Sequence, residues 1–349
     1  MAVIPWTLVS VAWFLILQPA QADDSRAPDP LFQSDEVLNV RIVAPLSTLL
    51  SERPFEEELP AKFQYTDAAG LDVEFDIKLR TRGKFRRQEH ICKFPPLRLN
   101  FKTSQTKNTL FHKQDKIKLV THCQRTARYM QVLLREYLAY RILNVMTNAS
   151  YNVRLLQITY VDAEEKRRDD VRYGFVIEHK DRLAKRLDKA LLEIPGTRVS
   201  ALNSEYTNLI SVYHYLIGNT DFSMIKAAPG RPCCHNHVLF GNEDELIYAI
   251  PYDFDQSGLV NAPHAGPNER LRLRNVRQRL YRGRCVNNKQ LPATFTGFNA
   301  KRETITALIN DLEIFSKRSG KRMLDYLEDF YKAIGSERQV NSAFIKKCI

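Results

Sequence analysis

Beyond residue 22 the sequence has no apolar run of about 18 residues, the length that a membrane-spanning helix requires. We therefore expect no integral membrane segment in the mature chain. The sequence also has no Cys-x2-Cys pair, so the adjacent Cys233 and Cys234 are a poor match to common zinc-binding patterns. An EF-hand loop opening at Asp253 is disfavoured as well, because His264 stands where that loop needs a glutamate.

The first 22 residues carry no charged side chain and end in Ala-Gln-Ala, after an apolar stretch at residues 9–17. This pattern favours a cleaved signal peptide at residues 1–22, with an uncleaved anchor as the alternative. Residues 23–36 are rich in Asp, Pro and Ser and are expected to form a flexible leader. Six cysteines in an exported chain predict up to three disulfides in a secreted or periplasmic protein, and the sequence leaves the 15 possible connectivities open.

The chain is basic, with a formal net charge of +12. Such a charge favours acidic partners, namely an acidic protein or an envelope glycan as acceptor. Nucleic acid is a less favoured partner outside the cell. A solvated basic surface without a partner is the alternative.

Residues 37–180 show the alternation of apolar and polar side chains that is typical of strands, interrupted by one amphipathic helix at residues 129–145. From residue 181 the pattern is mostly helical. The predicted fold class is therefore α+β, with an antiparallel, sheet-rich part at residues 37–180 and a mainly helical part at residues 181–349. The expected strands are residues 37–43, 62–65, 71–80, 96–101, 117–121, 151–161 and 173–178.

A stretch at residues 206–258 contains the polar residues most suited to chemistry. A helical pattern there ends at Gly218 and delivers Asp221 to a turn, while Asn236 follows a Cys- and Pro-rich loop. Asp253 and Asp255 come just after an expected strand, and side chains two apart on an extended backbone point to the same face. These residues predict a metal and proton-transfer site. Asp255 is either a second metal ligand or a turn residue.

Basic residues in the first half complement those acids. Arg82 and Gly83 lie in a turn, at residues 80–87, where one glycine stands among five cations, so the turn could cover phosphate groups. The alternative is a solvated basic hairpin. Lys93 is flanked by apolar residues and is a candidate for an inward ammonium group, for which Glu136, beside the apolar stripe of its helix, is the natural partner.

Several short motifs occur in an order that resembles the CotH-type secreted atypical protein kinase family, and the similarity covers roughly residues 37–260. The motifs are Leu79-Arg80-Thr81-Arg82-Gly83, Lys93, Leu134-Arg135-Glu136-Tyr137-Leu138-Ala139, Tyr173-Gly174-Phe175-Val176-Ile177-Glu178, Gly218-Asn219-Thr220-Asp221, His235-Asn236-His237-Val238 and Ile250-Pro251-Tyr252-Asp253-Phe254-Asp255. The sequence departs from the family at residues 84–87, where the family usually has Asn and Ser, and in the insert at residues 225–234.

This resemblance implies a bilobal kinase-like fold that binds ATP and Mg²⁺ or Mn²⁺. It implies that Lys93 contacts the nucleotide phosphates and pairs with Glu136, and that Glu178 lies near the adenine. It further implies Asp221 as the base at the acceptor hydroxyl, with Asn236 and Asp253 holding the metal.

The leading interpretation is therefore an exported phosphotransferase that moves the γ-phosphoryl group of ATP to a hydroxyl of a protein or glycan. Two alternatives remain open. One is a catalytically inactive module that binds an anionic polymer or a partner protein, and the other is a metal-dependent phosphoester hydrolase.

Overall fold

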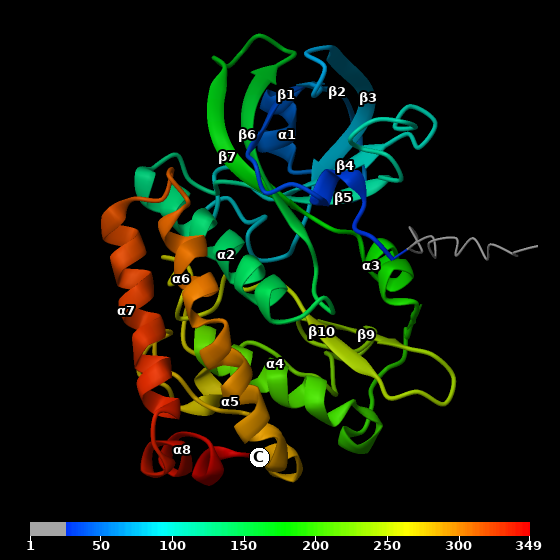
Figure 1. Ribbon diagram of the computed structural model, residues 1–349. Helices are drawn as coiled ribbons and strands as arrows, with labels where there is room; N and C mark the ends of the chain where they lie inside the picture. The colour runs from blue at the N-terminus through cyan, green and yellow to red at the C-terminus, as the bar shows by residue number, and fades with distance from the viewer. Residues whose placement is uncertain (1–25) are drawn as a thin grey trace, which may run out of the picture.

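The computed structural model describes residues 26–349, and its first part is a closed barrel of seven strands (Figure 1). Around the barrel the strand order is β1-β2-β3-β4-β5-β7-β6. The strands are β1 (Leu38–Ala44), β2 (Leu59–Thr66), β3 (Asp72–Thr81), β4 (Leu97–Phe101), β5 (Lys116–Val120), β6 (Val153–Asp162) and β7 (Asp170–Ile177).

The barrel closes through a parallel pair, in which β1 lies beside β6 with Leu38 opposite Leu156 and Ala44 opposite Asp162. The other neighbouring strands of the barrel pair antiparallel. The predicted bilobal kinase-like fold with an antiparallel sheet was therefore wrong. Alternation along a strand tells which side chains face inward, but it does not tell which distant strand will pair with the first one.

Aromatic side chains fill the inside of the barrel. Phe63, Phe75 and Phe101 come from three strands, and Phe111 enters from the β4–β5 connection. The Phe63 and Phe111 ring centroids are 4.9 Å apart, and those of Phe101 and Phe111 are 5.1 Å apart. Each ring contributes about 1.5–3 kcal/mol by leaving water, so this cluster is a main source of the barrel's stability.

Part of the expected flexible leader is packed against the barrel. Leu31 is fully buried, and Asp29 accepts hydrogen bonds from Arg182 (2.7 Å) and Gln114 (2.8 Å). The predicted signal peptide at residues 1–22 lies outside the described residues. Within residues 26–349, no helix is long and apolar enough to cross a membrane.

Helix α2 (Ala127–Met146) contacts β6 and β7 of the barrel and, farther from the barrel, helix α6 (Arg302–Asn310) (Figure 1). Thr126 caps its first turn by accepting a hydrogen bond from the Tyr129 amide. One continuous core extends from α2 and the inner ends of β6 and β7 into the C-terminal helices, so it crosses the expected boundary near residue 180.

The other helices are short or of medium length, and a three-stranded sheet of order β10-β9-β8 lies beside α4. The helices are α1 (Leu46–Glu52), α3 (Lys180–Leu187), α4 (Ser204–Ile217), α5 (Leu291–Ala300), α6 (Arg302–Asn310), α7 (Lys317–Ile334) and α8 (Glu337–Ala343). The small sheet consists of β8 (Ala190–Leu191), β9 (His237–Gly241) and β10 (Tyr248–Pro251).

Three disulfides pair the six cysteines: Cys92–Cys123, Cys233–Cys234 and Cys285–Cys348. The first joins the segment before β4 to the end of β5, and the third holds the C-terminal segment to the start of the 3₁₀ turn before α5. The predicted presence of disulfide bonds is confirmed. They are compatible with a protein of an oxidising, extracytoplasmic compartment.

Candidate functional site

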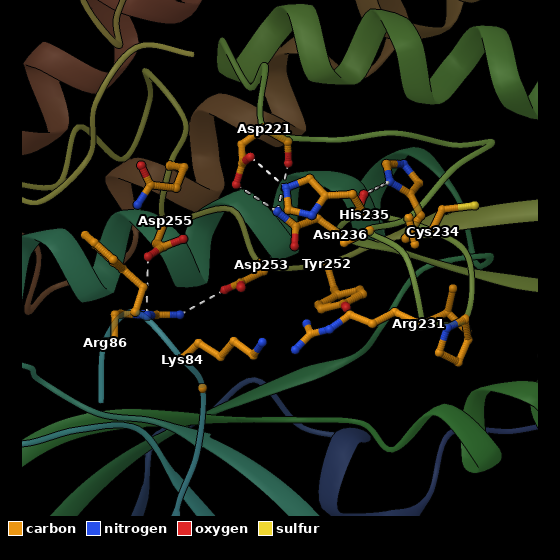
Figure 2. A pocket seen from close by; sticks show the side chains of 18 of the residues that line it. Lys84, Arg86, Asp221, Arg231, Cys234, His235, Asn236, Tyr252, Asp253 and Asp255 are labelled. Carbon is orange, nitrogen blue, oxygen red and sulfur yellow. Dashed lines mark hydrogen bonds and ion pairs between the residues drawn. The ribbon is translucent and has the colours of Figure 1, made fainter. Parts of the chain in front are cut away.

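A cleft of about 1230 Å³ lies between the barrel and the small sheet (Figure 2). The β3–β4 connection forms one wall with residues 82–86. The opposite wall contains Asp221 from the turn after α4 and Asn236 from the segment before β9, and Asp253 and Asp255 follow β10. The structure thus brings six of the predicted site residues to one cavity, namely Asp221, Asp253, Asp255, Asn236, Arg82 and Gly83.

Asp221 is held in place by its neighbours. Helix α4 ends at Gly218, whose positive φ of 63° lets the chain turn sharply, and the Asn219 side chain then accepts a hydrogen bond from the Asp221 amide (2.9 Å). Asn236 donates to Asp221 Oδ2 (3.0 Å), and His235 Nε2 lies 2.7 Å from Asp221 Oδ1. The hydrogen bond to Asp221 raises the pKa of His235. Asp221 therefore has a fixed orientation although its side chain is 38% exposed.

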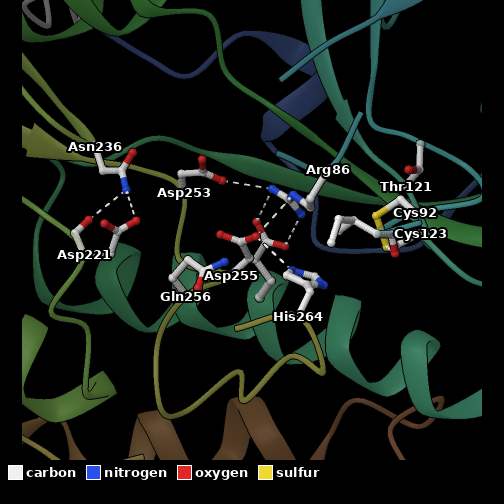
Figure 3. Close-up of polar contacts among 12 residues, drawn as sticks. Arg86, Cys92, Thr121, Cys123, Asp221, Asn236, Asp253, Asp255, Gln256 and His264 are labelled. Atoms are coloured by element: carbon white, nitrogen blue, oxygen red, sulfur yellow. Dashed lines mark hydrogen bonds and ion pairs between the residues drawn. A yellow bond between two sulfur atoms is a disulfide. The ribbon is translucent and has the colours of Figure 1, made fainter. Parts of the chain in front are cut away.

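Arg86 is the central residue of the second half of the site, because three carboxylates converge on its guanidinium group (Figure 3). The distances are 3.0 Å to Glu136 Oε2, 2.9 Å to Asp253 Oδ1 and 3.3 Å to Asp255 Oδ2. His264 Nε2 lies 3.1 Å from Asp255 Oδ2 on the other side. The basic turn is therefore not a solvated hairpin, since it inserts Arg86 among the acids.

The three carboxylates outnumber the one guanidinium that they share. Burial raises the pKa of Glu136 to about 7, a rise that Arg86 opposes and that the nearby acids Asp255 and Asp253 support. Burial also raises the pKa of Asp253, with Asp255 acting in the same direction. For Asp255 the effect of burial is outweighed by Arg86 and His264, which leave its pKa below the usual range. The surplus of acid makes this part of the cleft attractive to a cation.

Cationic side chains face these acids across the cleft. Lys84 and Arg231 reach into the same space from opposite sides, below Tyr252 (Figure 2). The Lys118 ammonium group lies 4.7 Å from the centre of the Tyr252 ring. Burial lowers the pKa of Lys118 to about 7, and the positive charge of Arg82 acts in the same direction. We call Arg82, Lys84, Lys118 and Arg231 the cationic wall.

Two predicted residues lie elsewhere. Lys93 stands between the buried Cys92 and Phe94, so it points outward and pairs with Glu89 at 2.8 Å, with both side chains about two-thirds exposed. The expected pair of Lys93 with Glu136 does not form, and Arg86 pairs with Glu136 instead. Glu178 does not line the cleft. It binds Arg186 at 2.8 Å and the Asn152 amide at 3.0 Å, which anchors the end of β7.

Sequence reasoning did not select Lys118 or Arg86. Lys118 lies between Ile117 and Leu119 in an expected strand, so the rule that selected Lys93, a lysine flanked by apolar residues, applied to it as well. Arg86 was noted only as one of the five cations of the turn at residues 80–87 and as part of the departure at residues 84–87. No sequence signal identified its three acidic partners, which lie 50, 167 and 169 positions away.

A buried pair of histidines lies next to the turns that carry Asp221 and Asn236. His214 of α4 and His237 of β9 approach to 3.2 Å between their Nε2 atoms, and Asn219 lies 3.3 Å from His214 Nδ1. Burial lowers the pKa of His237 to about 3 and holds that of His214 well below its ordinary value. Both rings are therefore neutral at physiological pH and form a rigid support for the turns that carry Asp221 and Asn236.

A metal at this site would have few protein ligands. Within residues 26–349, no group of three or more His, Cys, Asp or Glu side chains is placed to hold a metal ion. Asp221, Asn236 and Asp253 offer two carboxylates and one amide oxygen at the same cleft. Mg²⁺ is bound through one or two carboxylates when a nucleotide supplies phosphate oxygens, so this donor set fits a nucleotide-bound Mg²⁺ better than a free ion.

Comparison with known proteins gives no assignment, because no family model matches the chain and no curated protein matches it.

Proposed function

We propose that this protein is a secreted or periplasmic phosphotransferase that moves the γ-phosphoryl group of ATP to a hydroxyl group, with Mg²⁺ or Mn²⁺ as cofactor. The observation that carries the proposal is the arrangement of charges in one cleft. The cationic wall lines the same cavity, of about 1230 Å³, as Asp221, Asn236 and Asp253. Phosphoryl transfer depends mainly on positioning and on neutralising phosphate charge, and these residues are suited to both tasks.

In this proposal the cationic wall binds the phosphate oxygens of ATP. Asn236 and Asp253 are the residues that would hold the metal, which neutralises phosphate charge when it is bound. Asp221 accepts the proton of the acceptor hydroxyl as the new O–P bond forms and the bond from the γ-phosphorus to the ADP oxygen breaks. His235 orients Asp221 through the contact between its Nε2 atom and Asp221 Oδ1.

A second candidate, an inactive binding module, is favoured by Arg86. Its guanidinium group already neutralises Asp253 and Asp255, which a metal would otherwise bind. For activity Arg86 must give up at least its contact with Asp253, whose side chain is 36% exposed toward the cleft. The two candidates differ in one property, the dependence of nucleotide binding on metal.

Calorimetric titration of the oxidised protein with ATP, with and without Mg²⁺, separates them. We expect binding that requires Mg²⁺ and that is lost in Asp253→Ala. The matched control is Glu269→Ala, which removes an exposed acid from the rim of the same cleft. ATP binding that is absent, or equal with and without Mg²⁺ and in Asp253→Ala, would refute the phosphotransferase and leave the binding module.

A further inference from the structure

Four arginines gather on the surface beside the cleft, where the first halves of α2 and α7 meet. Figure 1 shows these two helix ends close together, and the Ser316 amide joins them by donating to Gln131 Oε1 at 3.0 Å. We define the arginine patch as Arg128, Arg135, Arg277 and Arg322. Arg128 and Arg135 are seven residues apart on α2 and hence lie on one face of that helix.

These guanidinium groups repel one another, and no acid within residues 26–349 forms an ion pair with them. Burial lowers the pKa of Arg135 to about 10, and the charges of Arg277, Arg128 and Arg322 act in the same direction. Among the described residues none of the four forms an ion pair, and the buried Nε of Arg135 has no hydrogen-bond partner. Like charges gathered without counter-charges destabilise the free protein, which a bound anion would reverse.

The nearby acids of α7 are engaged elsewhere. Asp325 pairs with Lys321 at 3.1 Å, and Asp329 lies 3.8 Å from Lys332. Arg277 itself is fixed in place, because its carbonyl accepts a hydrogen bond from the Tyr326 hydroxyl at 3.0 Å and its guanidinium lies 4.6 Å from the centre of that ring. Arg277 is therefore held in position in the free protein, while Arg128 and Arg322 are exposed.

The patch continues toward the cleft. Arg270 lines the cleft, and the exposed Arg272 and Arg274 lie between it and Arg277 along the chain. Val132 of α2 packs against Val260 and Ala262, which belong to the segment that follows Asp255. Exposed arginines thus follow the chain from the cleft to Arg277 of the patch, an arrangement that suits an extended polymer.

The surface composition distinguishes among polyanions. Exposed large hydrophobic residues serve as anchors for protein partners, yet those of the described chain lie outside the patch and outside residues 266–284. Stacking platforms for nucleic-acid bases are missing from the exposed positions of the patch for the same reason. Arginine forks bind carboxylate, sulfate and phosphate groups bidentately, which favours a charged sugar chain.

We propose that the arginine patch docks an anionic polysaccharide, and that a hydroxyl of the same chain enters the cleft as the phosphoryl acceptor. The second half of this statement rests on the function proposed above, whereas the docking does not. Such a polymer would release bound counterions on binding, so its affinity would fall steeply with salt.

The first experiment measures binding of a short heparin fragment as the probe, with neutral dextran as the uncharged control. The variant Arg128→Glu/Arg322→Glu reverses two exposed charges of the patch. Its control, Arg168→Glu/Arg338→Glu, makes the same change in formal charge at two exposed arginines elsewhere. We expect the patch variant to bind at least about tenfold more weakly with a shallower salt dependence, while the control stays near wild type.

Equal weakening in both variants, or none in the patch variant, would overturn the docking surface. Tighter binding of single-stranded DNA or polyaspartate than of heparin at equal ionic strength would overturn the assignment to a polysaccharide. Thermal unfolding of both variants shows whether each is folded. If the patch variant does not fold, Arg322→Ser alone gives the same comparison with a smaller change.

Titration with ATP and Mg²⁺ separates this proposal from the function on which its second half rests. The patch variant should keep wild-type ATP binding, because none of its substituted residues lines the cleft. Heparin binding without any ATP binding in the wild-type protein would leave the docking intact and remove the phosphotransferase. Label transfer from γ-labelled ATP to the heparin fragment by wild type, reduced in the patch variant through a higher KM, supports both halves.

Discussion

The barrel and the cleft side of the molecule are stabilised in different ways. Inside the barrel, aromatic and aliphatic side chains pack on one another, as Phe63, Phe75 and Phe111 do. On the cleft side, charged and polar groups such as Glu136, His237 and Asp255 are buried as well, each with specific partners. Because a buried polar group is costly without its partner, the ion pairs and hydrogen bonds among these groups hold the side chains of the cleft in fixed positions.

The largest expected effect concerns the cleft side of the molecule and is a loss of turnover. Asp221→Asn removes the proton acceptor but keeps the size of the side chain, so transfer should fall by about 10²- to 10⁴-fold while Mg²⁺-dependent ATP binding is retained. Measurement of kcat beside ATP affinity checks this. A loss of ATP affinity with unchanged kcat would contradict the role given to Asp221.

The second expected effect is on stability. Arg86→Ala leaves the buried Glu136 and Asp255 and the partly exposed Asp253 without their shared partner, and the loss of one member of a buried ion pair costs about 3–5 kcal/mol. Urea unfolding of the oxidised protein measures it. The control Lys84→Ala removes a neighbouring cation of the same loop, which has no ion pair within residues 26–349, and should change the free energy of unfolding little.

The third prediction compares one buried histidine in each region. His122 at the end of the barrel and His237 below the cleft have pKa values lowered by burial to about 4 and about 3. Between these values and the ordinary 6.5, the unfolded state binds more protons than the folded state. Their contribution to stability is therefore complete above pH 6.5 and is lost as the pH falls, with a slope of about 1.4 kcal/mol per pH unit for each group.

Unfolding free energies of His122→Gln and His237→Gln, measured against wild type from pH 7 down to about pH 3, test this. Each variant should lose part of the acid sensitivity of the wild type, and the difference for His237 should continue to a lower pH than that for His122. Parallel pH profiles of wild type and both variants would show that neither histidine carries the effect.

The smallest expected effect tests whether apolar packing is alike in both regions. Ile42 in the barrel and Ile210 in α4 are both fully buried. Ile42→Val and Ile210→Val should each cost about 0.5–1.5 kcal/mol in the free energy of unfolding. A much larger value on one side would mean that the two regions also differ in apolar packing.

The local structure of the barrel could be predicted from the sequence because it depends on alternation within each strand. The strand expected at residues 71–80 forms as Asp72–Thr81, for example. The closure of the barrel could not be predicted from the sequence, since it requires Leu38 to pair with Leu156. The mostly helical pattern expected after residue 181 did not show where one helix ends and the next begins. Helix α6 ends at Asn310, and Ser316 caps α7 by accepting a hydrogen bond from the Ser319 amide.

The candidate site was predictable where its residues are close in sequence or follow a clear element end, as Asp221 does after Gly218. The cationic residues of the cleft could not be predicted, because their position depends on which side of a strand faces the cleft. Lys93 and Lys118 both stand between two apolar residues in the sequence, yet of the two only Lys118 lines the cleft. The disulfide at Cys92 fixes the neighbouring side chain outward, and that pairing could not be derived from the sequence.

The parallel pairing of β1 with β6 also has a consequence for biosynthesis. The first strand leaves the ribosome long before its partner, since Asp162, opposite Ala44, follows more than a hundred residues later. Until then β1 can pair only with β2, and one edge of an apolar strand stays open to other chains. Closure of the barrel is a late, long-range event, so we expect folding to be slow and nascent chains that stop before residue 162 to be prone to aggregation.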